Sequence, residues 1–389
     1  MGIRVGPALL LLAVLAADPA AAEPAPVQAA DVLTWTQPVR EQNFSRMEKL
    51  LPHRIVPAGR KVRPLPAGAP LSVRLAGQGG GETLDAYMAA DHMVGLLVVQ
   101  DGRVRLEKYA PSLSPTGHWA TFSITKSLTS TLYGAALKDG AIRSLDDKVS
   151  AYLPEMAGSA YDGVSIRQLL TMTSGVKWSE NYTDPNSEVA RMYATPPDPG
   201  LDPIVSFMRR LPRVAEPGTV WNYKTGETDL AGILLARATG KTLSAYLAEK
   251  LWQPYGMEQD GVWMIDGSGH EPGGCCFSAA LRDLGRFGLF VLDGGTIDGR
   301  AVLAPGWLEA ATATAVPTGR PGLGYGYFWW TNADGTVDAR GIFGQMIHID
   351  RGRRLVVVML AAWPAAFSPE LNEGRVRLLA AIDRAVDQR

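Results

Sequence analysis

The sequence has 389 residues, of which 38 are basic and 39 acidic, and its formal net charge is −1. This balance gives no electrostatic case for binding nucleic acid or an anionic membrane surface. Two cysteines are too few for a scaffold built on disulfides, and the five histidines stand singly, without the paired spacing that predicts a metal site.

Residues 1–22 have the pattern of a cleavable secretory signal peptide. Arg4 precedes an apolar run at 8–16, and three alanines, the last of them Ala22, end the segment. The apolar run is too short for a permanent transmembrane helix, so an uncleaved anchor is the less favoured interpretation. No later stretch is long and apolar enough to span a bilayer. We therefore expect an exported protein, periplasmic or secreted, that is cleaved after Ala22 and has no permanent membrane anchor.

The next segment, residues 23–81, is rich in Pro, Ala and Gly and is predicted to be an N-terminal arm around the main body. It contains one short helical pattern at about 45–51. Beyond it, an Asp-Gly turn separates the apolar stretch 94–99 from the stretch 104–109, which predicts a β-hairpin. The hairpin leads the chain to a helix that begins at Ser123.

Helical and loop-rich patterns fill residues 141–259, within which the polar, proline-rich segment 178–203 is predicted to be irregular. Strands then return, and a helix closes the chain. The expected elements are helices at 230–239 and 243–251, strands at 324–332, 336–341, 346–350 and 355–360, and an amphipathic helix at 373–386. This order predicts an α+β fold, in which an antiparallel sheet is flanked by N- and C-terminal helices and carries an inserted, mostly helical lobe.

Ser123 and Lys126 are three residues apart at the predicted start of a helix that ends at Gly140. Positions i and i+3 lie on one face of a helix, so the hydroxyl and the amine can touch. Serine needs such a neighbouring base to act as a nucleophile, and the helix N-terminus favours developing negative charge. The spacing alone also fits an ordinary helix-start serine beside an exposed lysine. A second copy, Ser174 with Lys177, follows an apolar run like a helix end and is interpreted as a decoy.

Four separated segments occur in an order typical of one family. They are Phe-Ser-Ile-Thr-Lys-Ser at 122–127, Leu-Leu-Thr-Met-Thr-Ser-Gly at 169–175, Pro-Gly-Thr-Val-Trp-Asn-Tyr at 217–223 and Arg-Asp-Leu-Gly-Arg-Phe-Gly at 282–288. From about residue 85 to the C-terminus, the chain resembles the serine β-lactamase and penicillin-binding-protein superfamily, in its class C β-lactamase-related branch. This branch includes DD-peptidases, esterases and 6-aminohexanoate-dimer hydrolases. The resemblance implies that residues 82–389 form a β-lactamase-like serine hydrolase domain with Ser123 as nucleophile.

The second catalytic motif of this family is Tyr-x-Asn, and Tyr223-Lys224-Thr225 stands in its place. The resemblance implies that Tyr223 shares the role of base, which requires a pKa below its usual value of about 10. We expect the nearby cation of Lys126 to lower it. The alternative is a core tyrosine beside Trp221. Thr225 cannot offer both the donor and the acceptor of the family's asparagine, so contacts to the side chain of a β-lactam are weakened.

The third motif of the family, Lys-Thr-Gly or His-Thr-Gly on an edge strand, is placed at Ala339-Arg340-Gly341. The resemblance implies that the N–H groups of Ile342 and Ser123 form the oxyanion hole. The motif has lost its cation at Ala339, and Arg340 should point to the opposite face of the strand. An ordinary core strand that ends in a glycine bulge is the alternative interpretation.

Two further segments are expected beside the site. Residues 181–189 resemble the loop over the active site in the 6-aminohexanoate-dimer hydrolase branch, so Tyr182 is a candidate substrate contact, or else a structural loop aromatic. Residues 273–278 contain Cys275 and Cys276. Because adjacent cysteines pair only in a strained turn, we expect two packed thiols there, without chemistry of their own.

The resemblance implies acyl transfer through a covalent serine intermediate. Lys126 and Tyr223 take the Ser123 proton, Tyr223 returns a proton to the leaving group, and water then hydrolyses the acyl-enzyme, with no cofactor or metal implied. The expected substrate contacts are Tyr182, Thr225 and Gly341. The weakened second and third motifs favour a small ester or a linear amide over the β-lactams or peptidoglycan peptides of a β-lactamase or DD-peptidase. A non-catalytic penicillin-binding or sensor module is the alternative from another class.

Overall fold

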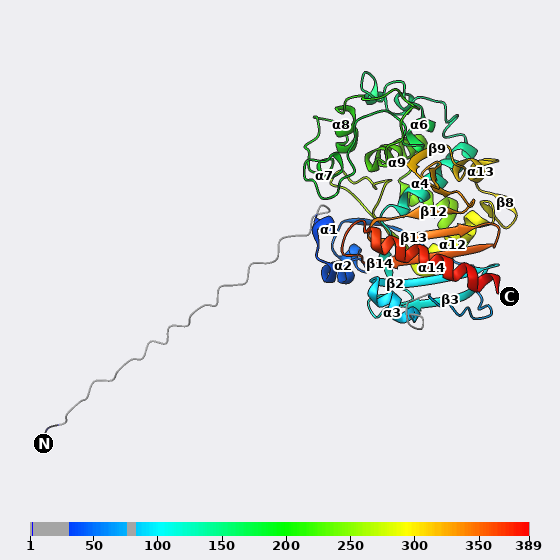
Figure 1. Ribbon diagram of the computed structural model, residues 1–389. Coiled ribbons are helices and arrows are strands. Elements are labelled where there is room, and N and C mark those ends of the chain that lie inside the picture. The colour runs from blue at the N-terminus through cyan, green and yellow to red at the C-terminus, as the bar shows by residue number, and fades with distance from the viewer. Residues whose placement is uncertain (1, 3–30, 76–82, 389) are drawn as a thin grey trace.

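The main feature of the computed structural model, which describes residues 2, 31–75 and 83–388, is an eight-stranded sheet in the order β3-β2-β14-β13-β12-β11-β10-β9. Its strands are β2 Met93–Gln100, β3 Arg103–Tyr109, β9 Val316–Arg320, β10 Leu323–Tyr325, β11 Trp330–Asn332, β12 Val337–Arg340, β13 Met346–Asp350 and β14 Leu355–Ala361. All neighbours pair antiparallel, and β2 pairs directly with β14 from the far end of the chain (Figure 1). The predicted fold class is confirmed, whereas the predicted signal peptide at 1–22 lies outside the described residues.

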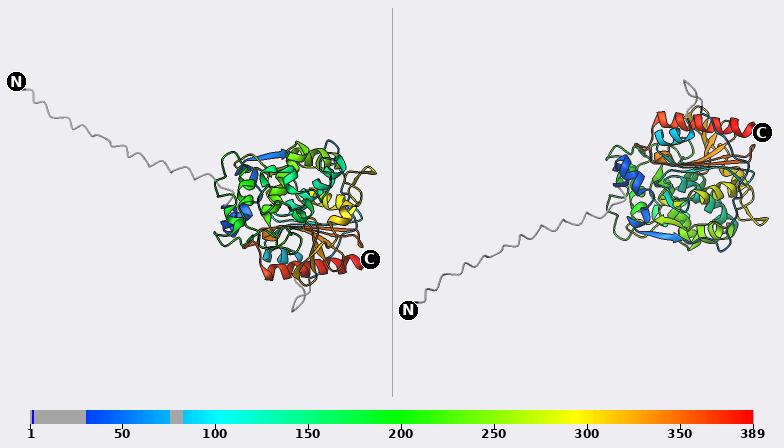
Figure 2. Two further views of the ribbon diagram at one scale, coloured as in Figure 1. Left: turned by 90° about the horizontal axis from the view of Figure 1, so that it is seen from above. Right: turned by 90° about the horizontal axis from the view of Figure 1, so that it is seen from below.

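Helices cover both faces of this sheet. The covering helices are α3 Leu84–Ala90, α4 Ile124–Asp139, α12 Leu281–Leu292 and α14 Pro369–Asp387. Apolar residues of α3 and α14 pack with Leu96 and Val98 of β2, and Figure 2 shows α14 along this face. On the opposite face α12 approaches closely, because Gly288 leaves room for the Val356 side chain. Since both faces are covered, β2 is buried at every position and is a continuous apolar run.

A second, four-stranded sheet in the order β1-β5-β6-β4 lies beside the nucleophile helix and is absent from the sequence-based expectations. Its strands are β1 His53–Val56, β4 His118–Ala120, β5 Gly261–Met264 and β6 Phe277–Ala280. The strands β5 and β6 are short and buried throughout, so the alternation that marks a half-buried strand is missing. Strand β4 ends three residues before Ser123 and fixes the direction from which the chain enters α4.

The lobe between α4 and β5 holds more regular structure than expected. Its helices are α5 Val149–Tyr152, η2 Pro154–Met156, α6 Ile166–Leu170, α7 Glu188–Arg191, α8 Pro203–Arg209, α9 Thr225–Thr239, α10 Leu243–Leu247, η3 Ala248–Trp252 and α11 Gln253–Tyr255. The segment 178–203, predicted to be irregular, contains α7 and runs into α8. Helix α9 begins at Thr225 rather than at Leu230, because the distant Glu180 carboxylate accepts the Thr225 N–H at 3.0 Å and satisfies an open helix terminus.

The described part of the N-terminal arm packs against the strand that leads to Ser123. Its helices are α1 Asp31–Thr34, α2 Gln37–Asn43 and η1 Met47–Lys49, the last within the helix expected at 45–51. The Phe44 carbonyl accepts the Ala120 N–H at 2.9 Å. The Phe44 ring lies 4.8 Å from the Phe122 ring and 5.4 Å from the Phe343 ring, centroid to centroid. The arm therefore supports the residues directly before the nucleophile.

The strand predicted at 324–332 is two strands, β10 and β11, joined by a tight turn. Within the turn Phe328 has a φ of 60°, a left-handed conformation that an aromatic residue rarely adopts. Its N–H donates to the Leu170 carbonyl at 3.1 Å, and its own carbonyl accepts the Ser127 hydroxyl at 2.9 Å. These partners lie far away in sequence, which is why the break is not visible there. The remaining elements are β7 Thr296–Ile297, β8 Arg300–Ala301, α13 Trp307–Ala311 and η4 Ile342–Gly344.

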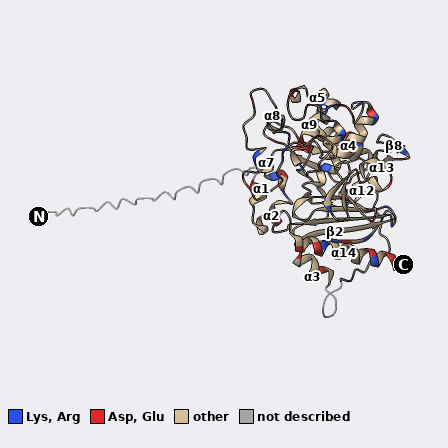
Figure 3. Ribbon diagram, turned by 45° about the horizontal axis from the view of Figure 1, so that its top comes forward, with Lys and Arg blue, Asp and Glu red and all other residues tan. Residues whose placement is uncertain are grey.

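Charged residues are distributed over the whole described chain. Figure 3 shows basic and acidic residues interspersed on the sheet and on the helical lobe. Several join separate elements, as where Arg282 of α12 donates to both oxygens of Glu107 on β3 at 2.7 Å. Within the described ranges, no helix has the length and apolar character needed to cross a bilayer.

Candidate active site

Ser123 occupies the N-cap position of α4 and is 7% exposed. The residue before it, Phe122, has a φ of 48°, a left-handed conformation that costs on the order of 1–3 kcal/mol for a bulky side chain. The Phe122 ring is held between the rings of Phe44 and Phe343, at 4.8 and 5.2 Å between centroids. This aromatic cluster holds the turn that presents the Ser123 hydroxyl, and it is not visible in the motif itself.

Lys126 lies one turn along α4, 1% exposed, with its amine directed at Ser123. Its Nζ donates to Ser123 Oγ at 3.1 Å, to Thr225 Oγ1 at 3.0 Å and to the Gly274 carbonyl at 2.7 Å. An ammonium group has three N–H bonds, and each of them has an acceptor here. Burial lowers the pKa of Lys126 to about 8, while the charges of Glu180 and Asp229 act in the opposite direction. The predicted contact between the hydroxyl and the amine is confirmed.

Tyr223 completes the group around Ser123. Its ring stacks on Trp330 at 5.5 Å, and the Lys126 amine lies 5.1 Å from the ring centroid. The expectation that Lys126 lowers the pKa of Tyr223 is wrong. Burial of the hydroxyl and the charge of Glu180 raise this pKa above its usual value, and the hydrogen bond with Ser123 offsets only part of the rise. The amine lies over the ring, and the raised pKa favours the phenol over the phenolate.

Glu180 anchors the loop beside Thr225 and was missed from the sequence. Its Oε2 accepts the Thr225 N–H at 3.0 Å and the Trp178 indole N–H, and its Oε1 accepts the Thr225 hydroxyl and, at 2.6 Å, the Tyr182 hydroxyl. Tyr182, the predicted substrate contact, therefore directs its hydroxyl to Glu180. One acidic residue in a polar loop carries no signal in the sequence, since its four donors come from three separate positions.

A second carboxylate, Asp229 on α9, supports the other side of Lys126. Its Oδ1 accepts the Gly274 N–H at 2.8 Å and its Oδ2 accepts the Tyr193 hydroxyl at 2.6 Å. Burial raises the pKa of Asp229 to about 6, and these two donors work against the rise. Asp229 therefore holds Gly274 through its N–H, and the carbonyl of the same residue accepts from Lys126 and positions the amine.

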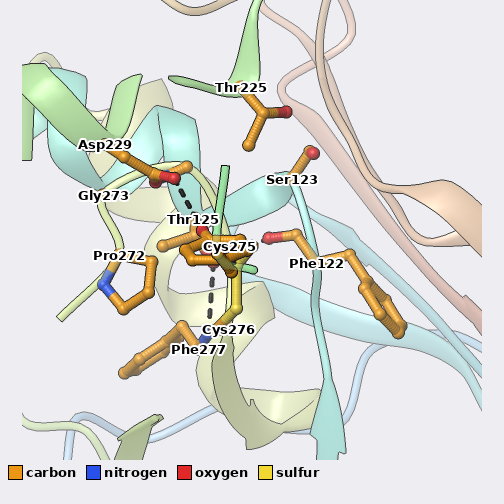
Figure 4. Close-up of a disulfide and its surroundings, with 12 residues drawn as sticks. Phe122, Ser123, Thr125, Thr225, Asp229, Pro272, Gly273, Cys275, Cys276 and Phe277 are labelled. Atoms are coloured by element: carbon orange, nitrogen blue, oxygen red, sulfur yellow. Dashed lines mark hydrogen bonds between the residues drawn. A yellow bond between two sulfur atoms is a disulfide. The ribbon is translucent and has the colours of Figure 1, made fainter. Parts of the chain in front are cut away.

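Cys275 and Cys276 form a disulfide, so the expectation of two packed thiols is wrong. Cys276 takes the required turn with a φ of 78°. Hydrogen bonds fix the chain on both sides of the pair, since Asp229 accepts the Gly274 N–H and Thr125 Oγ1 accepts the Phe277 N–H at 3.3 Å. Figure 4 shows the disulfide in this frame, near Ser123 and Thr225. Contacts to distant residues thus stabilise a turn that two adjacent cysteines alone would disfavour.

The backbone at Gly341 and Ile342 lies against the turn that precedes Ser123. A Cβ at Gly341 would collide with the Thr121 carbonyl oxygen, so only glycine allows this approach. Strand β12 ends at Arg340, as the predicted third motif requires. Arg340 pairs with Asp338 at 2.9 Å and lies over the Trp330 ring, away from the core side of Ala339. The predicted direction of the Arg340 side chain is confirmed.

The second Ser-x-x-Lys copy is structural. Ser174 is 0% exposed, donates its hydroxyl to the Glu227 carboxylate, and accepts the Val176 N–H at 3.1 Å. The Lys177 side chain is 59% exposed and pairs with Glu188 at 3.6 Å. The serine and the lysine of this copy have different partners, because the chain leaves the helix before it reaches them. The separate partners of Ser174 and Lys177 agree with the interpretation of this copy as a decoy, which stays a prediction.

Among the residues that the structure describes, one group of side chains outside this site has the spacing of metal ligands. Ligand atoms of Asp202, Asp266 and His270 lie within 4.8 Å of one another. Each has an ordinary partner: Asp202 caps α8 and bonds to His270, and Asp266 accepts N–H groups of its own turn. These contacts account for the group as a half-buried junction between loops.

The fold and the buried lysine beside a helix-start serine define a class, the serine hydrolases of amidase and esterase type. The chain belongs to the Beta-lactamase family, whose model matches residues 82–381. This match covers the main sheet, the helical lobe and each residue that surrounds Lys126.

Individual relatives refine this assignment. The chain is 30% identical over 309 residues to a 6-aminohexanoate-dimer hydrolase of Paenarthrobacter ureafaciens, which is 75% of this chain and 78% of that one. It is 28% identical over 159 residues to a lovastatin esterase of Penicillium rubens, which is 37% of this chain and 39% of that one. The solved structure of a candidate 6-aminohexanoate-dimer hydrolase from Bacillus anthracis has a TM-score of 0.80 at 21% identity, with 92% of this chain and 97% of that one covered. The structural likeness shows a shared fold.

Proposed function

We propose that the protein is an exported hydrolase that forms an acyl-enzyme on Ser123 and acts on a small ester or a linear amide. The observation that carries this proposal is the bond at 3.1 Å between Lys126 Nζ and Ser123 Oγ, in a place where burial lowers the pKa of the lysine to about 8. A buried amine with such a pKa is neutral in about one molecule in ten at pH 7 and in about half of the molecules at pH 8, so it can accept a proton.

The proposed mechanism assigns one task to each group. Neutral Lys126 takes the Ser123 proton as Oγ attacks the acyl carbon, and the N–H groups of Ser123 and Ile342 bind the oxyanion. The bond to the leaving group then breaks, and the leaving group takes a proton from the Tyr223 phenol, which regains one from Lys126. The raised pKa means that Tyr223 carries a proton before the leaving group departs, and the Lys126 ammonium replaces this proton as it is given up. Water afterwards hydrolyses the ester on Ser123 and restores the enzyme.

The charges around Ser123 favour a substrate without a carboxylate beside the scissile bond. Ala339 supplies no cation at the first position of the third motif, and Arg340 is held by Asp338. Two carboxylates, Glu180 and Asp229, flank Lys126 and disfavour a further anion. Penicillins and peptides with a C-terminal carboxylate lack a partner for that group. The named activities of the two curated relatives, on a linear amide dimer and on an ester, agree with this choice.

Intact mass spectrometry tests the proposal directly. The protein is incubated in parallel with a short-chain p-nitrophenyl ester, the linear dimer of 6-aminohexanoate and a penicillin, and product release is followed in each. We expect turnover of the ester or of the amide, and an acyl adduct on Ser123 in rapidly quenched samples. No hydrolysis in any arm, with no adduct from a fluorophosphonate, would instead identify a non-catalytic binding module. Faster turnover of the penicillin than of the ester and the amide would contradict the proposed substrate class.

The acylation rate should rise with pH through about 8. Lys126 must lose its proton to act as a base, and its pKa in the folded protein is about 8 rather than its usual 10.5. The active, neutral form is therefore scarce well below pH 8 and saturated well above it. Measurement of kcat/KM for a neutral ester across this range gives the midpoint. A rate that falls as pH rises through 8 would exclude Lys126 as the base.

Export is a separate part of the proposal. It is based on the signal-peptide pattern in residues 1–22. N-terminal sequencing of the protein recovered outside the cytoplasm of an expressing cell should begin at Glu23. Recovery of an uncleaved chain only in the cytoplasm would contradict it.

A further inference from the structure

Glu180 is the one carboxylate that reaches the amine of Lys126 through a side-chain hydroxyl among the described residues, and no step of the proposed mechanism uses it. Thr225 is the intermediary: it donates to Glu180 through both its N–H and its hydroxyl, and its Oγ1 accepts from Lys126 Nζ at 3.0 Å. We propose that Glu180 is a positioning residue which, through Thr225, directs the lone pair of neutral Lys126 at Ser123 and sets the pH at which this base becomes available. This inference depends on the proposed function of the same site.

The direction of the Thr225 hydroxyl hydrogen determines where the lone pair of neutral Lys126 points. A threonine hydroxyl has one hydrogen, and Glu180 accepts it, so Thr225 Oγ1 can only accept toward Lys126. The Gly274 carbonyl, 2.7 Å from Nζ, can also only accept. A neutral amine has two N–H bonds and one lone pair. If both N–H bonds are used on Thr225 and Gly274, the lone pair is left for the Ser123 hydroxyl.

Loss of the Glu180 acceptor would undo this arrangement. The Thr225 hydroxyl would then be free to rotate and donate its hydrogen to the lone pair of Lys126. The lone pair would be occupied by Thr225 at the moment when Ser123 needs it. Glu180 thus fixes a choice between two hydrogen-bond arrangements that would otherwise be similar in energy.

The charge of Glu180 also acts on the pKa of Lys126. The titratable groups that face Lys126 are Glu180 from the 178–187 loop, Asp229 from α9 and Tyr223 from the segment before α9. Burial lowers the pKa of Lys126, and the two carboxylates raise it. Tyr182 and Trp178 donate to the carboxylate of Glu180 as well, so it is fixed in position rather than mobile. Its charge therefore acts on Lys126 at a constant geometry.

The test is the pH profile of Glu180→Gln, measured as kcat/KM for a neutral activated ester and as the rate of fluorophosphonate labelling. Removal of the charge should move the midpoint of the rise down by about one pH unit, because an opposite charge nearby is lost. The plateau above the midpoint should fall about tenfold, since the glutamine amide can donate to Thr225 Oγ1 and turn the Thr225 hydrogen toward Lys126. Thr225→Val removes the hydroxyl that joins Glu180 to Lys126, and it should shift the midpoint in the same direction. When Glu180→Gln is added to Thr225→Val, the additional shift should be less than half of the shift that Glu180→Gln causes in the wild type.

Glu188→Gln is the matched control. Glu188 is a buried carboxylate on the same segment of chain, it accepts the Ser179 N–H at 2.8 Å, and its charged partner is Lys177 rather than Lys126. The midpoint of the pH profile of Glu188→Gln should equal that of the wild type. If Glu180→Gln does not fold, Glu180→Asp takes its place: the charge stays, so the midpoint should stay near that of the wild type, while the plateau should fall because the shorter side chain no longer reaches the Thr225 hydroxyl. An unchanged plateau in this variant would overturn the proposal. An equal loss of rate at every pH, with the midpoint unmoved, would show that Glu180 only holds the loop and would overturn the proposal. Absence of any labelling of the wild-type protein would instead overturn the proposed function, before any variant is measured.

Discussion

Replacement of Ser123 by alanine should lower kcat for esters and amides by roughly three orders of magnitude or more. Among the described residues Lys126 contacts two hydroxyls, and that of Thr225 donates to Glu180, so the Ser123 hydroxyl is the one that can form the acyl bond. What remains in the variant is catalysis by binding and by the oxyanion hole. The fold should tolerate the change, because the lost hydrogen bonds are those of the Ser123 hydroxyl with Lys126 and Tyr223, and the turn is held by the ring cluster around Phe122. Turnover of an activated ester, together with intact mass after fluorophosphonate treatment, measures the effect.

Ser174→Ala is the control for this variant, since it removes the serine of the second Ser-x-x-Lys copy. Its hydroxyl bonds to Glu227, a carboxylate that is 0% exposed and whose Oε2 has no hydrogen-bond partner. The free energy of unfolding should therefore fall by about 1–3 kcal/mol, while kcat per folded molecule stays close to wild type. A fully active Ser123→Ala protein, or an inactive but folded Ser174→Ala protein, would show that the wrong serine was assigned.

The catalytic pair could be found in the sequence because its geometry is local. Ser123 and Lys126 lie on one helix, and the spacing of i and i+3 fixes their separation before any tertiary contact is known. The same holds for strands β2, β3, β12, β13 and β14 of the central sheet, which correspond to predicted strands, whereas β9 was not predicted and β10 and β11 were predicted as one strand. The two residues of the decoy are also close in sequence, but no helix joins them, and the chain around Ser174 belongs to a turn held by Glu227.

The partners of Lys126 could not be found in this way. Thr225 and Gly274 lie 99 and 148 positions along the chain from it. Glu180 and Asp229 act through these two residues and touch neither Ser123 nor Lys126 by a direct hydrogen bond. Their roles follow from the packing of α9 and of two loops, for which single residues give no periodic signal.

The pKa of Tyr223 and the pairing of the two cysteines could not be predicted correctly from the sequence either. In both cases the expectation followed from the intrinsic chemistry of the residue beside its neighbours in sequence. Burial outweighs the cation near Tyr223, and the chain around the paired cysteines is held by the N–H groups of Gly274 and Phe277, which donate to Asp229 and Thr125. Short buried strands such as β5 and β6 were missed for a related reason, because complete burial removes the alternation on which the prediction depends.

Replacement of Lys126 by methionine should lower kcat/KM by about two to four orders of magnitude and remove the rise in rate through pH 8. Methionine is close to lysine in length and apolar, so it fills the buried channel without an amine. Thr225 Oγ1 and the Gly274 carbonyl lose a donor, which costs about 1–3 kcal/mol of stability, while the cost of burying the ammonium disappears. The midpoint of thermal unfolding should therefore stay close to that of the wild type, although most of the activity is lost. Lys177→Met, which alters the exposed lysine of the decoy, should leave both quantities near wild type.

The pH profile of the Lys126→Met protein also decides between the two candidate bases. If Lys126 is the base, the residual activity has no midpoint near 8, because Tyr223 keeps its proton throughout that range. Retention of most of the activity would mean that Tyr223 takes the Ser123 proton itself. That outcome would require bound substrate to lower a pKa that burial and the charge of Glu180 raise in the free protein. This second result would make Tyr223 the base in place of Lys126. Glu180 would then oppose the base, because its charge raises the pKa of Tyr223.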